Sequence, residues 1–197
     1  MSKATRFVLK NVRLSYPALD KARPGMAGGE DKFSANFLIE KGDAENIETI
    51  RENLIAALGE KFPDRAKLPA ILRNNDLKSY LSPDGKAGWP LRDGDFMDKD
   101  GYEGTVFVRA ANKMAPFTID VNNHATNPKT FYAGCYVDAA LEAYAWENAS
   151  SGTKGVSLTL HGVKFAGDGD SFGAAPVSSA EFFGGGDGSD DPFNYNV

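Results

Sequence analysis

Alternating apolar and polar residues predict β-strands along most of this chain. The strands are expected over residues 6–16, 32–40, 105–113, 117–121, 134–148 and 156–165. In residues 134–148 every second position from Cys135 to Ala145 is small or apolar, whereas the other face carries aromatic and acidic side chains. Such alternation is typical of strands with one face on a core, so the body is expected to be mainly β.

One amphipathic helix is expected after the second strand. Asp43 is a suitable N-cap, and Gly59 is the expected stop. Apolar residues fall on one stripe between them, at Ile47, Ile50, Leu54, Ala57 and Leu58. The outer face carries Glu45, Glu48 and Glu52, which would repel phosphates. We therefore interpret this helix as a cover on a barrel and not as a recognition helix.

Two segments read as loops. Residues 20–31 are rich in glycine and contain Lys21 and Arg23, which predicts a mobile, basic loop. Residues 61–104 form a loop-rich insertion with several turn signals and a possible short helix over 69–74. Strands interrupted by a helix and an insertion are compatible with an OB-fold, so we expect an OB-fold-like Greek-key barrel with one covering helix.

The last stretch, residues 166–197, differs in composition from the rest. It holds six acidic residues and seven glycines but no lysine or arginine. Such a segment cannot bury enough apolar surface to offset its ordering entropy, so a disordered acidic tail is expected after a domain spanning residues 1–165. Two carboxylates and two aromatic rings stand near its end, in Asp190, Asp191, Phe193 and Tyr195. They resemble a short peptide ligand for a partner protein, although incidental aromatics in a disordered terminus would look the same.

Removing the tail changes the charge balance of the body. The chain has 22 basic and 27 acidic residues, so subtracting the six tail acids leaves 22 against 21. An acidic arm on a near-neutral body can compete for the cationic surface of that body, which is a signal of nucleic-acid binding. The single cysteine, Cys135, rules out an internal disulfide framework and favours an intracellular, cytoplasmic protein.

Catalytic and cofactor motifs are poorly matched. No glycine loop ends in Gly-Lys-Ser/Thr, so the phosphate cradle of nucleotide hydrolases is missing. His124 and His161 have no metal-ligand spacing to each other or to Cys135. No apolar run is long enough to cross a membrane. We expect no enzyme activity, no metal or other cofactor, and no membrane partner.

Candidate contacts to a single strand combine cations for phosphates with aromatic rings for stacking. They are Lys21, Arg23, Trp89, Arg92, Arg109, Lys113, Tyr136, Tyr144 and Trp146. Trp89 could equally anchor the insertion to the body. The face of Tyr136, Tyr144 and Trp146 also carries Asp138 and Glu142, so it could instead pack under the helix or insertion. Arg109 and Lys113 could also belong to an ordinary solvated strand face.

Three runs of sequence carry a resemblance to a known family. They are FYAGCYVDAALEAYAWE, KGVSLTLHGVKFAGDGDSFG and AEFFGGGDGSDDPF, and they resemble the phage-encoded single-stranded-DNA-binding proteins that join an OB-fold to an acidic tail. The resemblance implies coating of single-stranded DNA during phage replication and recombination. It also implies that the tail restrains the DNA groove and recruits replication proteins, such as a DNA polymerase or helicase-primase. Whether Phe193 or Tyr195 anchors the tail stays open, because four residues follow Phe193 here.

A structural or assembly protein of a virion is the alternative, because β-rich bodies and glycine-rich tails also occur in that class. The oligomeric state is expected to be a monomer or a homodimer.

Overall fold

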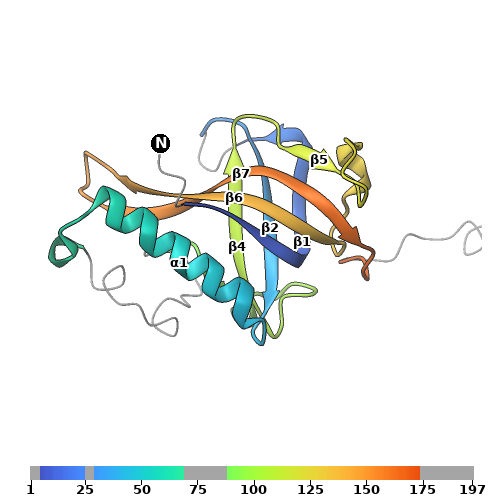
Figure 1. The fold of residues 1–197 in the computed structure, drawn as a ribbon, viewed down its shortest axis with the longest axis horizontal. Helices are drawn as coiled ribbons and strands as arrows, with labels where there is room; N and C mark the ends of the chain where they lie inside the picture. Colours follow the sequence, from blue (N-terminus) through green and yellow to red (C-terminus); the bar gives the residue numbers. More distant parts are fainter. Residues whose placement is uncertain (1–4, 25–28, 69–87, 174–197) are drawn as a thin grey trace, which may run out of the picture.

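The computed structural model describes residues 5–24, 29–68 and 88–173, and Figure 1 shows their arrangement. The strands are β1 (Arg6–Arg23), β2 (Lys32–Glu40), β3 (Arg92–Asp93), β4 (Thr105–Asn112), β5 (Phe117–Ile119), β6 (Tyr136–Glu147) and β7 (Lys154–Gly167). The α-helix is α1 (Ala44–Lys61), and short 3-10 helices lie at Arg65–Lys67, Gly94–Phe96 and Pro128–Thr130. No helix in the described part of the chain combines the length and apolar character needed to cross a membrane.

Five strands close into a barrel. Antiparallel pairings join β4, β2, β1, β6 and β7 in that order, and a parallel pairing of β4 with β7 at Ala110–Leu158 and Ala111–Thr159 closes the ring. β3 continues the sheet beside the first half of β4, and β5 pairs in parallel with β7. This closed ring with one helix confirms the predicted OB-fold-like barrel.

The core follows the predicted alternation. Val137, Ala139 and Leu141 of β6 are fully buried, while their neighbours face outward. Cys135 also lies in the core, where burial raises the pKa of its thiol to about 11, so the thiol is neutral and structural. The apolar stripe of α1 joins the same core through Ile50 and the residues that follow it on that face, so the helix covers the barrel as predicted.

The helix ends differ in part from the prediction. The carboxylate of Asp43 accepts a hydrogen bond from the backbone N–H of Asn46, which confirms the N-cap. The predicted stop at Gly59 is wrong, because the helix continues to Lys61 and the N–H of Phe62 caps it on the carbonyl of Leu58 at 2.7 Å. A glycine ends a helix only where the backbone turns left-handed, and Gly59 keeps a negative φ.

The first strand is longer than predicted. It was expected to end before Pro17, but β1 runs through this proline to Arg23 and pairs there with Lys32 of β2. The register shifts between Ser15 and Ala18, and Tyr16 has a φ of 48°. A bulge needs no ladder hydrogen bond from the proline position, so the strand can resume beyond it. Lys21 and Arg23, which were predicted on a mobile loop, therefore lie on a strand.

The described half of the insertion covers the outer face of β2 and β4. Tyr102 is fully buried against Leu38 and Phe107 in a second, small core. Its hydroxyl accepts a hydrogen bond from the amide of Asn36 at 2.7 Å and donates to the hydroxyl of Ser15 at 3.2 Å. The short helix expected over residues 69–74 lies outside the described residues.

After β7, residues 168–173 pack against the body, and we call them the C-terminal strap. The guanidinium of Arg13 lies over the ring of Phe172 at 4.4 Å and donates to the carbonyl of Asp170 at 2.5 Å. The N–H of Phe172 donates to the carbonyl of Ala133 at 3.0 Å. Contacts with the body thus continue past the predicted boundary at residue 165. The remaining tail, with Asp190, Asp191, Phe193 and Tyr195, lies outside the described residues.

Candidate nucleic-acid interface

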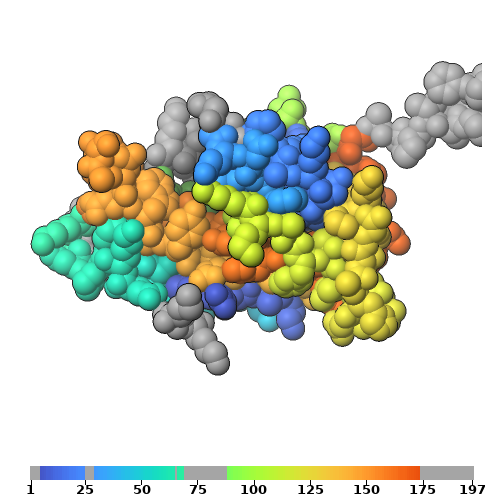
Figure 2. Space-filling model, turned by 90° about the horizontal axis from the view of Figure 1, so that it is seen from above, coloured from blue at the N-terminus to red at the C-terminus, as the bar shows by residue number. Residues whose placement is uncertain are grey.

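A groove of about 330 Å³ opens on the outside of the barrel. It lies where β4 stops pairing with β3 and begins to pair with β7. We call it the aromatic–arginine groove. Its lining comes from β2, β3, β4, β6, β7 and the segment before β3, and includes Lys32, Trp89, Arg92, Arg109, Tyr144, Trp146 and Ser157. Figure 2 shows the blue β1–β2 region, the lime-green end of β4 and the orange β6–β7 region side by side on one face. The strand-2 and strand-3 face of an OB-fold is its usual oligonucleotide surface, and here those strands are β2 and β4.

The two arginines share one face of the sheet. Arg92 of β3 stands opposite Phe107 of β4, and directly paired residues point to the same side. Arg109 follows Phe107 by two positions and therefore also points outward. Its side chain is exposed, and a guanidinium nitrogen donates to the hydroxyl of Ser34 at 3.4 Å. Both guanidinium groups can thus face a ligand in the groove.

Two aromatic rings come from the outer face of β6. Tyr144 is 45% exposed. Trp146 is half-buried, and its indole N–H donates to the hydroxyl of Ser157 at 2.9 Å. Gly155 lies under this ring, because a Cβ there would come within 2.4 Å of it. The glycine and the hydrogen bond fix the orientation of Trp146 before any ligand binds.

Trp89 differs from Trp146 in burial. Only 4% of its surface is exposed, and it belongs to the main core. The neighbouring carbonyl of Gly88 accepts a hydrogen bond from the N–H of Val156 in β7 at 2.7 Å. These contacts favour the alternative in which Trp89 anchors the insertion, so that it forms a wall of the groove.

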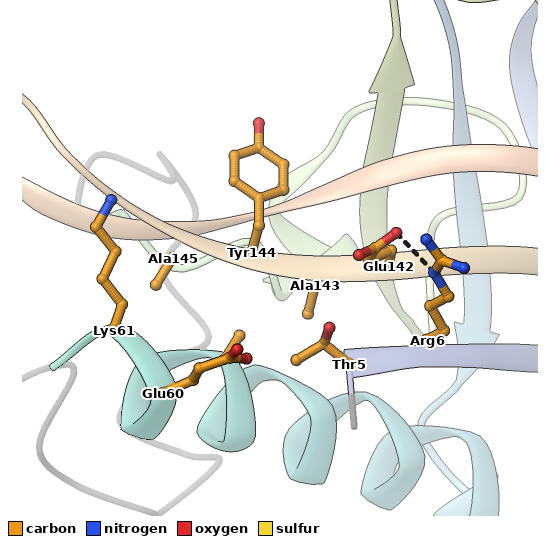
Figure 3. Close-up of a pocket in the computed structure, with 9 residues that line it drawn as sticks. Thr5, Arg6, Glu60, Lys61, Glu142, Ala143, Tyr144 and Ala145 are labelled. Carbon is orange, nitrogen blue, oxygen red and sulfur yellow. Dashed lines mark hydrogen bonds and ion pairs between the residues drawn. The ribbon is translucent and has the colours of Figure 1, made fainter. Parts of the chain in front are cut away.

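The predicted alternative in which the outer face of β6 packs under α1 is wrong for Tyr144. Figure 3 shows Tyr144 projecting away from the helix, whereas Ala143 and Ala145 point toward it. The acids that share this face are also engaged elsewhere. Asp138 accepts the backbone N–H of Asn11 at 2.9 Å, and Glu142 is bound by Arg6 and His161.

The remaining predicted contacts lie outside the groove. Lys21 and Arg23 are exposed on β1, and Arg23 pairs in register with the groove residue Lys32. Lys113 follows β4 and forms an ion pair with Glu30, which lowers the pKa of that carboxyl. Tyr136 stands at the opposite end of β6, 5.5 Å from the guanidinium of Arg13. The fold thus brings five of the predicted residues together and leaves these four apart.

Two polar lining residues, Lys32 and Ser157, were missed by sequence reasoning. Lys32 opens β2 directly after the glycine-rich segment, which is a usual ligand-binding position in an OB-fold and could have been noticed. Ser157 faces Tyr144 across the β6–β7 ladder, and that register is set only by the folded hairpin.

The charge of the groove is one-sided. Its described lining contains three cations, Lys32, Arg92 and Arg109, and no carboxylate. Glu147, near the groove, is bound by Lys154 at 2.9 Å. The described residues contain no group of three or more histidine, cysteine or carboxylate side chains that could hold a metal ion. The arrangement suits binding of a polyanion whose bases can stack on exposed rings.

Comparison with known proteins identifies relatives of this chain. A family model described as the Enterobacter phage Enc34 ssDNA-binding protein matches residues 5–193. The putative protein p50 of Acyrthosiphon pisum secondary endosymbiont phage 1 is 38% identical over 182 residues, which cover 89% of this chain and 90% of that protein.

Solved structures share the fold. The single-stranded DNA-binding protein of bacteriophage Enc34 in complex with ssDNA is 24% identical, with a TM-score of 0.69 over 87% of this chain and 91% of that chain. The single-stranded DNA binding protein gp2.5 of bacteriophage T7 is 9% identical, with a TM-score of 0.55 over 90% of this chain and 92% of that chain.

Proposed function

This chain belongs to the family of the Enterobacter phage Enc34 ssDNA-binding protein, and we propose that it binds single-stranded DNA in the aromatic–arginine groove with little sequence preference. Family membership favours this function over a structural or assembly role in a virion. The Enc34 protein, which has the same fold, has been solved with ssDNA bound.

The convergence of Arg92, Arg109, Tyr144 and Trp146 on one groove, whose described lining has no carboxylate, carries the proposal. Cations along a groove attract the phosphates of any sequence, and displaced counterions make that attraction dependent on salt. Aromatic rings add stacking, which tolerates every base because every base has a π-face. A site built from these two elements is therefore expected to read the backbone and the base faces, not the base edges.

Titration with a fluorescent oligothymidylate at several salt concentrations tests this function. Substituting Arg109→Ala should weaken binding at low salt and reduce the slope of log affinity against log salt by about one unit, because one phosphate contact is lost. Lys129→Ala is the matched control, since Lys129 is an exposed cation beyond the other end of β6 and should leave the slope unchanged. An affinity that does not vary with salt in the unmodified protein would contradict the proposal.

We also propose the wider role that the family resemblance implies. The protein coats single strands in the host cytoplasm during phage replication and recombination and performs no catalysis itself. The acidic tail competes for the groove at low salt, and its tip recruits a replication protein. The composition of residues 166–197 supports this role, because six carboxylates without a cation form a polyanion tethered to the body.

A further inference from the structure

A second cavity lies on the other side of Tyr144. It has a volume of about 370 Å³ and is formed between β6 and the C-terminal half of α1 (Figure 3). Tyr144 lines both this cavity and the aromatic–arginine groove. A strand that leaves the groove over this ring therefore arrives directly at the second cavity, which we call the helix cavity.

The helix cavity has an apolar floor and a cation on each side. Figure 3 shows Ala143 and Ala145 of β6 pointing toward the helix, and Ala57 of α1 also lines the cavity. Figure 3 shows Lys61 and Arg6 on opposite sides of this floor. A flat apolar surface between two cations matches a nucleotide, in which an uncharged ring is joined to charged phosphates.

The charges of the cavity also distinguish a nucleotide from a bare anion. Arg6 is bound to Glu142 at 3.0 Å, and Glu142 also contacts the imidazole of His161 at 2.7 Å. Glu60 stands next to Lys61 at the end of α1, where the helix dipole is negative. The two cations of the lining are balanced by two carboxylates, which disfavours a bare anion such as free phosphate. A nucleotide contributes apolar contact in addition to its charge, so it can still bind there.

We propose that the helix cavity is a second nucleotide subsite, which receives the strand after it crosses Tyr144. The base lies over the alanine floor, and Lys61 contacts a phosphate. Tyr144 lies at the border of the two cavities with its ring on the side of β6 away from the helix, so it can stack on a base in the groove just before the strand passes to the helix cavity. This inference rests on the proposed function, because the occupant is the same DNA strand.

Oligonucleotide length separates the two sites in a binding experiment. Affinity is measured for oligothymidylates from about 4 to 16 nucleotides, the range of site sizes known for single OB-folds. Short oligonucleotides that fill only the groove should bind Lys61→Ala and the unmodified protein equally. Beyond the length at which the strand reaches the helix cavity, Lys61→Ala should bind several-fold more weakly at low salt, with a salt slope lower by about one unit.

Two further variants serve as controls. Lys61→Arg retains the cation and should restore both affinity and slope. Lys129→Ala removes an exposed cation that lies beyond the opposite end of β6, and this variant should behave as the unmodified protein at every length. Lys61 is exposed on the last turn of α1, so its replacement leaves the core intact.

The outcomes discriminate between the subsite and the function. If Lys61→Ala matched the unmodified protein at every length, or lost the same factor at every length, the subsite would be wrong while the proposed function stood. If the unmodified protein bound none of the oligonucleotides, the proposed function and the subsite would both be overturned.

Discussion

The two tryptophans, Trp89 and Trp146, have different surroundings. Trp146 is half-buried beside the groove with its indole N–H held by Ser157, whereas only 4% of Trp89 is exposed. Stacking requires an accessible ring face, so Trp146 is the better candidate for base contact. Trp89 stabilises the body instead.

Substitution of each tryptophan should separate these roles. Trp146→Ala is expected to weaken binding of single-stranded DNA by about 1 to 3 kcal/mol, with a smaller loss for Trp146→Phe. Trp89→Ala is expected to lower the free energy of unfolding by about 3 to 5 kcal/mol, because it empties part of the core. Fluorescence titration and denaturant unfolding measure the two effects. If Trp146→Ala unfolded the protein while Trp146→Phe bound DNA as tightly as the unmodified protein, the ring of Trp146 would be assigned to packing.

Residue types in the groove could be read from the sequence, but their neighbours could not. Arg109, Tyr144 and Trp146 fall on outward positions of alternating strands, and the structure places them there. The burial of Trp89 depends on contact between the insertion and β7, and the contacting residues Gly88 and Val156 are 68 positions apart along the chain. Periodicity within one segment carries no information about such a contact.

At the scale of elements, one side chain links α1 to β1. Asn46 is buried, its amide donates to the carbonyl of Lys10 at 2.9 Å, and its side-chain oxygen accepts the N–H of Lys10 at 2.9 Å. Asn11, which follows Lys10, has a φ of 52°. At this point the regular ladder between β1 and β6 is interrupted. Asn46 thus replaces strand hydrogen bonds that the irregular backbone cannot make.

Asn46→Ala should therefore destabilise the protein by about 1 to 3 kcal/mol, because a backbone donor and acceptor lose their partner in a mostly buried site. Denaturant unfolding provides the measurement. Asn53→Ala is the matched control on the same helix, since Asn53 donates only to Thr49 one turn earlier and its loss should cost less than about 0.5 kcal/mol. Equal losses for both variants would show that the link to β1 contributes nothing.

Elements defined by local pattern were predicted well, and those altered by tertiary pairing were not. The bounds of β2 agree with the prediction at both ends, because its alternation is regular and turn residues flank it. The extension of β1 beyond Pro17 depends on pairing with β2 across a bulge. Local sequence indicates a break at a proline, and only the partner strand shows that the chain resumes its direction.

At the scale of the whole molecule, closure of the barrel was the least accessible feature. The parallel contact of β4 with β7 joins residues that are nearly 50 positions apart, and it creates the corner at which the groove opens. Alternation predicts that strands exist and which face is buried. It cannot assign their neighbours, so the candidate contacts could be named but not assembled into one site.

The tail allows a test at the same scale. A chain ending at Gly173 lacks Glu181, Asp187, Asp190 and Asp191, and should bind single-stranded DNA more tightly than the full chain. The gain should be largest at low salt, because a tethered polyanion competes at an effective concentration in the millimolar range and salt screens it. Titration at several salt concentrations provides the measurement.

A variant with Phe193→Ala and Tyr195→Ala keeps every carboxylate and serves as the control. It should bind DNA as the full chain does, but it should lose capture of the replication protein in a pull-down. Unchanged affinity after truncation at every salt concentration would show that the tail does not compete for the groove.

The C-terminal strap restricts how this sequence can vary. A Cβ at Gly101 would come within 2.1 Å of the ring of Phe172, and a Cβ at Gly134 within 2.1 Å of the carbonyl of Asp170. Together with Arg13, which stacks on Phe172, these positions come from four distant parts of the chain. If one of these residues changes, the contacts that require the others are lost. Substitutions at these positions should therefore occur together. Covariation among residues 13, 101, 134 and 172 in other members of the family would therefore mark which of them retain a strap.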